Sequence, residues 1–102
     1  MQQYRKTFII VAILALTPTL LQAQVDSLFG VAREFAFNGK RAEARAICDS
    51  ILKLSPTYAD VILLKGRTFS WDGMRKEARF EFNKVIKRDS TNTEAWEALS
   101  DV

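Results

Sequence analysis

The residues of this chain repeat with a period of 34 positions. Downstream of residue 24, ten positions carry the same residue as the position 34 places further on. The identical pairs are Asp26/Asp60, Arg33/Arg67, Phe35/Phe69, Gly39/Gly73, Arg41/Arg75, Glu43/Glu77, Ala44/Ala78, Arg45/Arg79, Lys53/Lys87 and Thr57/Thr91. Ordinary composition gives about two such matches. A period in this range is typical of proteins that stack small structural units into a solenoid, so we expect a repeat architecture.

Each repeat unit has the pattern of two helices joined by a turn. Apolar residues follow at helical spacing in the first helix of unit one, at Leu28, Val31, Ala32 and Phe35, and they predict a helix over 25–38. The dipeptides Asn38-Gly39 and Asp72-Gly73 are turn signals. Second helices are predicted over 41–54 and 75–88.

Two kinds of signal mark the boundary between units. Ser55-Pro56 ends the first unit, because proline lacks a backbone donor and disfavours helix in the residue before it. Thr57-x-x-Asp60 and Thr91-x-x-Glu94 then resemble capping patterns at the start of the next helix. The helix starts, turns and apolar stripes thus share one period, which favours an all-helical repeat fold.

Small residues at equivalent positions predict close helix contacts. Gly66 occupies the middle of a predicted helix, where glycine lowers helix stability, so we expect a neighbouring helix to approach it closely. Ala44 and Ala78 lie in the first turn of each second helix and are expected to pack against the first helix of the same unit. Cys48 falls where a mid-sized apolar side chain is expected and is interpreted as a core residue, with a disulfide to another chain as the alternative.

The segment 1–23 has the pattern of a secretory signal peptide. Basic residues at positions 5 and 6 precede an apolar run over 8–16, which Pro18 follows, and Ala23 offers a small residue at a cleavage site. A retained membrane anchor is the alternative, although a spanning helix needs about 20 apolar residues. We therefore predict a signal peptide over 1–23 and a repeat region over 24–102.

Composition restricts the chemistry that the chain can carry. It has no histidine and one cysteine, which excludes histidine-based catalysis, most metal sites and an internal disulfide. Without the segment 1–23 the net charge falls from +3 to +1, which removes support for a nucleic-acid surface. We predict no catalytic, cofactor-binding or metal-binding residue.

The repeat resembles the tetratricopeptide repeat. Its signature positions are occupied by Leu28, Ala32, Phe35, Gly39, Ala44, Pro56, Ile62, Gly66, Phe69, Gly73, Ala78, Phe82 and Trp96, whereas Lys65 and Ser90 depart from the pattern. The resemblance implies an all-α solenoid of antiparallel helix pairs. Its repeats are expected over about 25–58 and 59–92, and the first helix of a third repeat over 93–102.

A narrower resemblance involves the segment from Leu64 to Gly73, followed by Glu77-Ala78-Arg79. This segment is similar to the N-terminal repeat region of YaiO-type outer-membrane β-barrel proteins. The resemblance implies export in a Gram-negative bacterium and a periplasmic repeat region that precedes a barrel. Because the sequence reaches only the first helix of the third unit, we expect the parent protein to continue, with the barrel as its membrane contact.

In this family the first helix of each repeat lines a concave groove. The resemblance therefore assigns the groove to Phe29, Arg33, Phe37, Leu63, Arg67 and Trp71, with Asp26 and Asp60 at a neighbouring inward position. We expect the two arginines to form a basic ladder beside the aromatic pair, which suits acidic or aromatic peptides and also sugar polymers. As structural alternatives, the aspartates cap helices, the arginines pair with acids of the next unit, and the aromatic residues pack under a neighbour.

These observations predict a non-enzymatic protein-interaction module of the cell envelope, whose partner is a protein or peptide, or a polysaccharide. We expect it to be the N-terminal part of a YaiO-like outer-membrane protein. A soluble periplasmic scaffold without a barrel is one alternative. Regulatory repeats of an envelope enzyme, with the catalytic domain elsewhere in the parent protein, are another.

Overall fold

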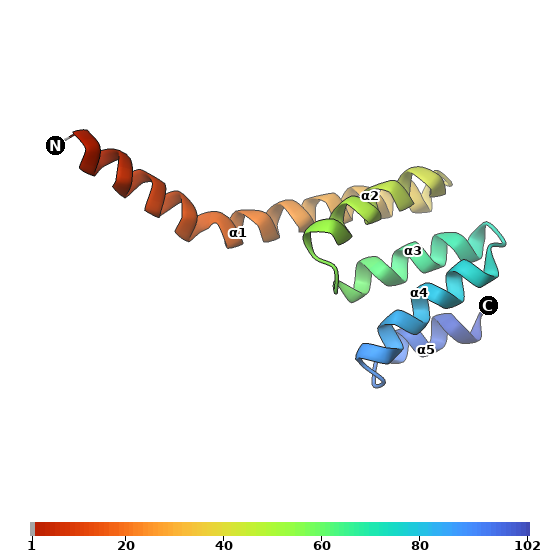
Figure 1. The fold of residues 1–102 in the computed structure, drawn as a ribbon. Coiled ribbons are helices and arrows are strands. Elements are labelled where there is room, and N and C mark those ends of the chain that lie inside the picture. The colour runs from red at the N-terminus through yellow and green to blue at the C-terminus, as the bar shows by residue number, and fades with distance from the viewer. Residues whose placement is uncertain (1) are drawn as a thin grey trace.

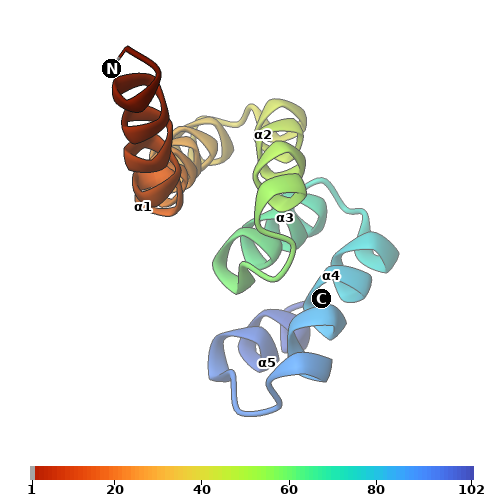
Figure 2. The same ribbon diagram turned by 60° about the vertical axis from the view of Figure 1, so that its left-hand side comes forward.

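The computed structural model describes the backbone of residues 2–102 and the surroundings of side chains from residue 18 onward. In this part of the chain there are five helices and no strand. They are α1 (Gln2–Phe37), α2 (Arg41–Leu54), α3 (Ala59–Trp71), α4 (Arg75–Arg88) and α5 (Thr93–Ser100). Figures 1 and 2 show the helices following one another in chain order, with α3 between α2 and α4. The predicted all-α class is confirmed.

The ends of these helices repeat with the period of the sequence. α2 and α4 begin one repeat period apart, as do α3 and α5, and the ends of α1 and α3 are separated by the same interval. Gly39 and Gly73 follow the ends of α1 and α3 with φ values of 82° and 76°, a left-handed conformation that favours glycine. The amide of Lys40 donates to the carbonyl of Phe35 at 2.9 Å, and the equivalent bond in the second unit measures 2.8 Å. Both turns are therefore the same helix-ending motif.

The predicted capping patterns are wrong in detail. Tyr58 occupies the capping position of α3, and its side chain makes no capping hydrogen bond. The predicted residue, Thr57, lies one position before it. α5 is capped by Asn92, whose side-chain oxygen accepts a hydrogen bond of 3.0 Å from the amide of Ala95. The hydroxyl of Thr91 instead donates to Asp89. Asparagine is one of the best capping residues, and it lies one position closer to the helix.

α1 is longer than the helix predicted over 25–38. It runs continuously through Pro18, and Figure 1 shows that its axis bends along its length. A proline inside a helix removes one backbone donor and typically kinks the helix. The predicted signal peptide over 1–23 lies largely outside the residues whose side chains are described, so it stays a prediction. Within the described residues, no helix combines the length and the apolar character needed to cross a membrane.

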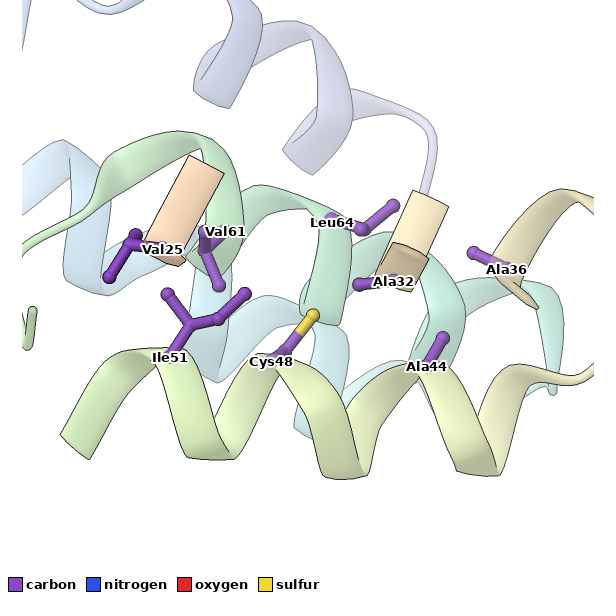
Figure 3. Close-up of a cluster of buried hydrophobic side chains, with 8 residues drawn as sticks. All are labelled: Val25, Ala32, Ala36, Ala44, Cys48, Ile51, Val61 and Leu64. Carbon is purple, nitrogen blue, oxygen red and sulfur yellow. The ribbon is translucent and has the colours of Figure 1, made fainter. Parts of the chain in front are cut away.

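Two clusters of buried side chains hold the helices together. The first joins α1, α2 and α3 through Val25, Ala32, Ala36, Ala44, Cys48, Ile51, Val61 and Leu64 (Figure 3). The second joins α3, α4 and α5 through Ile62, Leu63, Ala78, Phe82, Val85, Ala95 and Ala98. Because α3 contributes to both clusters, it couples the first helix pair to the second.

Cys48 is fully buried in the first cluster, which confirms its predicted place in the core. Its sulfur points toward the side chains of α1 and α3 (Figure 3). Loss of solvent contact, reinforced by the neighbouring Asp49 carboxylate, raises the pKa of the Cys48 thiol to about 11. The thiol is therefore neutral at physiological pH and packs as a small apolar group.

Gly66 confirms the predicted close approach of a neighbouring helix. A Cβ atom added to Gly66 would lie 2.8 Å from Cδ1 and 3.0 Å from Cζ of Phe82, so the ring of α4 rests directly on the backbone of α3. Ala44 and Ala78, in the first turns of α2 and α4, are also completely buried, as predicted.

Ion pairs connect the two helix pairs outside the apolar clusters. Arg41 and Arg45 of α2 bind the two carboxylate oxygens of Asp72 at 3.0 and 2.8 Å. These hydrogen bonds lower the pKa of Asp72 below its usual value. Because Asp72 follows the end of α3, the two arginines join α2 to the turn between α3 and α4.

A second ionic contact explains why Lys65 departs from the repeat pattern. Its ammonium group lies 2.7 Å from Asp49 of α2 and 3.6 Å from Glu81 of α4. Glu81 is only 3% exposed and also binds Lys84 at 3.1 Å. Lys65 thus pairs with carboxylates on the helices at either side of α3, and those pairs compensate the charge of Glu81 in its buried position.

Candidate binding groove

A groove of about 690 Å³ runs along the facing surfaces of α1 and α3. We call it the α1/α3 groove. Its lining residues are Asp26, Phe29, Arg33 and Phe37 of α1, Asp60, Leu64, Arg67 and Trp71 of α3, Tyr58 just before α3, and Glu94 of α5. Three types of residue recur along it in a fixed order, because equivalent residues of α1 and α3 are separated by one repeat period in the sequence.

Five of the six residues predicted for a groove line this one: Phe29, Arg33, Phe37, Arg67 and Trp71. The placement of Leu63 in the groove is wrong. Leu63 is completely buried in the second core cluster, together with Ala95 and Ala98 of α5, and the adjacent Leu64 lines the groove instead. Leu63 occupies the repeat position in α3 that Phe29 occupies in α1. Leu63 is covered by α5.

The aromatic end of the groove is formed by Phe37 and Trp71. Their ring centroids are 5.8 Å apart with an interplanar angle of 47°, so the two rings lie in contact at a tilt. Phe37 remains 72% exposed and Trp71 42% exposed. Neither ring is therefore packed under another helix of the described chain, and both offer apolar surface to a ligand.

Two arginines lie in the middle of the groove, and they differ in the groups that they contact. The guanidinium of Arg67 binds the Glu94 carboxylate of the following unit at 2.8 Å. Arg33 instead lies 4.9 Å from the ring centre of Phe29, and among residues 18–102 no carboxylate approaches it within 4.0 Å. For Arg67 the structural alternative, pairing with an acid of the next unit, is confirmed, so the predicted basic ladder carries one unpaired charge among the described residues, that of Arg33.

The other end of the groove is acidic. Asp26, Asp60 and Glu94 occupy the same position in successive repeat units, and all three line the groove. The Asp26 carboxylate accepts hydrogen bonds from the side-chain amide Nε2 of Gln22 at 2.9 Å and from the hydroxyl of Tyr58 at 3.3 Å. Asp60 is exposed in the first turn of α3, which contradicts a capping role for its side chain because Tyr58 is the capping position.

Tyr58 is a lining residue that the sequence interpretation missed. Its ring packs edge-on against Phe29 with centroids 5.6 Å apart. Partial burial and the adjacent Asp26 carboxylate raise the pKa of its hydroxyl. Tyr58 precedes a helix and belongs to no helical stripe, so the apolar periodicity carries no signal for it.

The groove lining offers several kinds of non-covalent contact to a ligand. The lining offers carboxylates, guanidinium groups, a phenol hydroxyl and aromatic rings, which make ion pairs, hydrogen bonds and stacking contacts. Within the described residues, no group of three or more potential ligands lies in an arrangement that would hold a metal ion. In comparisons with known proteins, no family model matches the chain and no curated protein matches its sequence.

Proposed function

We propose that this chain is a non-enzymatic binding module, which holds a segment of another protein in the α1/α3 groove. One observation carries the proposal: acidic, basic and aromatic residues recur in the same order on two neighbouring helices and line a single groove. A polypeptide is the ligand whose side chains and backbone match all three types of group at once.

The proposal includes an architecture of the tetratricopeptide type. Its support is the common period of helix ends and turn glycines, together with the close contact of Phe82 on Gly66. In such an architecture each unit is a helix pair that buries its apolar surface against its neighbours. The first helices of successive units then present equivalent side chains along one continuous face.

We further propose that the module acts in the bacterial periplasm, as part of a YaiO-like outer-membrane protein. The support is the signal-like pattern of residues 1–23 and the similarity of the segment from Leu64 to Gly73. Fractionation of cells that produce the full parent protein tests this placement. Recovery in the cytoplasm, with residues 1–23 still attached, would contradict it.

Selection from a phage-displayed library of random peptides tests the binding function. The immobilised full chain is the bait, and the affinity of each enriched peptide is measured by fluorescence anisotropy. Replacing both groove aromatics, with Phe37→Ser and Trp71→Ser, is expected to weaken binding tenfold or more, about 1.4 kcal/mol, because exposed aromatic anchors dominate such contacts.

The matched control is Phe80→Ser on α4, outside the groove. Phe80 is 63% exposed, so its replacement removes an exposed aromatic ring, as Phe37→Ser does, without changing the groove. We expect this control to bind the enriched peptides with wild-type affinity. The proposal fails if the selection enriches no peptide, or if Phe80→Ser weakens binding as much as the groove double variant does.

A further inference from the structure

We infer that the α1/α3 groove selects an extended peptide segment with a basic side chain at one end, an acidic side chain in the middle and an apolar side chain at the other end. The inference rests on the proposed binding function and specifies the chemistry of its ligand. It follows from which charges in the groove are already paired and which are not.

Asp26 and Asp60 define where the basic side chain binds. The hydrogen-bond partners of Asp26 are the side-chain amide of Gln22 and the hydroxyl of Tyr58, and both groups are neutral. Among residues 18–102, no lysine or arginine lies within 4.0 Å of either aspartate. Within that part of the chain, two carboxylates without a basic partner thus face the same end of one groove, and an ammonium or guanidinium group complements them.

Arg33 defines where an acidic side chain binds. It lies two helical turns along α1 from Asp26, about 10 Å at 1.5 Å per residue. Its guanidinium is held against Phe29 and is not paired with a carboxylate of the described chain. Arg67 does not offer a second site for an acidic side chain, because its guanidinium already binds the Glu94 carboxylate at 2.8 Å. Among the described lining residues, one positive charge therefore remains free, and it lies between the acidic and aromatic ends.

Phe37 and Trp71 define where an apolar side chain binds. Asp26 and Phe37 are three helical turns apart on α1, which corresponds to about 16 Å along the helix axis. An extended peptide advances about 3.3 Å per residue, and alternate side chains lie on the same face. Side chains one, three and five of an extended pentapeptide therefore span about 13 Å. The length of a lysine side chain covers the difference from the separation of about 16 Å between Asp26 and Phe37.

The alternating charges favour a peptide over a sugar polymer. A neutral polysaccharide leaves the two aspartates and Arg33 without charged partners, and a uniformly acidic polymer is repelled by Asp26, Asp60 and Glu94. A polypeptide carries both charges and an apolar group within a short segment. The peptide is therefore the occupant that complements each part of the lining.

The probe is the acetylated and amidated peptide Lys-Ser-Asp-Ser-Phe, measured together with its reversed sequence because either chain direction fits the groove. The comparison peptide, Glu-Ser-Asp-Ser-Phe, differs only in the charge of its first side chain. Isothermal titration of the full chain is expected to show that the better lysine probe binds about two- to fivefold more tightly than the glutamate peptide, which is the effect of an exposed ion pair. Raising the salt concentration should reduce that difference.

Asp60→Lys is the decisive variant, and Asp101→Lys at an exposed position outside the groove is its matched control. We expect Asp60→Lys to abolish the preference for the lysine peptide, because the new ammonium group offsets the charge of Asp26, and Asp101→Lys to leave the preference unchanged. Circular dichroism verifies that both variants keep wild-type helicity. Asp60→Asn, which is closer to the native side chain in size and leaves the Asp26 carboxylate in place, should reduce the preference even if Asp60→Lys loses its fold.

Three results would overturn the inference. They are equal binding of the two peptides, a preference that Asp60→Asn does not alter, and tighter binding of a neutral hexasaccharide than of either peptide. Library peptides that bind the groove without this charge order would refute the inference and leave the proposed binding function standing. A library that yields no binder would refute both.

Discussion

The contact between Gly66 and Phe82 makes a quantitative prediction about how the two helix pairs of the chain are joined. Gly66→Ala places a methyl group 2.8 Å from Cδ1 of the Phe82 ring, so α3 and α4 must move apart or the ring must rotate. Overpacking of this kind costs about 1–3 kcal/mol of unfolding free energy. The same substitution gains about 1 kcal/mol of helix propensity, so the net loss is about 0–2 kcal/mol.

Gly30→Ala is a matched control that isolates the packing cost. Gly30 also lies inside a helix, and a Cβ atom added there would meet no atom within 4 Å. Both substitutions gain helix propensity, so the difference between the two variants reports the clash alone. We expect Gly30→Ala to raise the free energy of unfolding by about 0.5–1 kcal/mol and to exceed Gly66→Ala by about 1–3 kcal/mol.

Thermal and urea unfolding, followed by far-ultraviolet circular dichroism, measure these differences. One kcal/mol corresponds to about 4–8 °C in Tm for a domain of this size. In the Phe82→Leu background, which removes the ring from the contact, Gly66→Ala should cost less than in the wild-type background. If Gly66→Ala and Gly30→Ala stabilise the chain equally, the proposed packing of α4 against the backbone of α3 is wrong.

Three further predictions follow from the core and the ion pairs. Ala78→Leu, at a completely buried position, should lower the free energy of unfolding by about 1–3 kcal/mol, and a wild-type urea midpoint would contradict it. The Cys48 pKa of about 11, against an ordinary 9.0, implies about 100-fold less thiolate at pH 8, so a thiol reagent should label the native chain at least 100-fold more slowly than the urea-unfolded chain. Comparable labelling rates would show that Cys48 is accessible. The pKa of Asp72 is lowered in the folded state, so this carboxylate stabilises the fold at pH values above its ordinary pKa of 3.8. That contribution is lost as the pH falls through the folded-state pKa. Below about pH 4 the wild-type chain should therefore lose stability more steeply than Asp72→Asn, and parallel pH profiles would remove the Arg41 and Arg45 contacts from the account.

Much of the fold could be predicted because local signals and the repeat agree. The predicted second helices over 41–54 and 75–88 coincide with α2 and α4, and Gly39 and Gly73 end the preceding helices as expected. Glycine in a left-handed turn and apolar residues at helical spacing act over a short stretch of chain, so the sequence displays them directly. The close approach at Gly66 was also predictable, because glycine inside a helix requires a packing reason.

The errors at Leu63 and Arg67 have a common cause, which is that equivalent positions do not have equivalent neighbours. Leu63 occupies the same repeat position as Phe29, yet α5 covers Leu63 and buries it. Arg67 occupies the position of Arg33, yet within the described part of the chain only Arg67 is paired with a carboxylate, that of Glu94. A sequence period predicts which residues share a face, but burial and charge pairing depend on the helix that packs on that face.

The contacts of Lys65 illustrate the same limit. The sequence shows a lysine where the repeat pattern favours an apolar residue, but it does not show what pairs with the charge. Asp49 and Glu81 belong to the preceding and the following helix, and the folding of α2 and α4 against α3 brings both to the ammonium group. Contacts between helices of this kind follow from the packing and not from local patterns.

The fluorescence of Trp71 reports binding in the α1/α3 groove, because Trp71 lines the groove and the chain has only one other tryptophan. That residue, Trp96, lies outside the groove and donates its indole N–H to the carbonyl of Ser90 at 2.9 Å. In the Trp96→Phe variant all indole emission therefore comes from the groove. Titration with a library-selected peptide that lacks tryptophan should shift the emission of Trp71 to shorter wavelength and saturate, whereas Trp71→Phe, which retains Trp96, should show no shift. Saturable binding of the same peptide, measured by anisotropy, with unchanged Trp71 emission would contradict the assignment of the α1/α3 groove as the binding site.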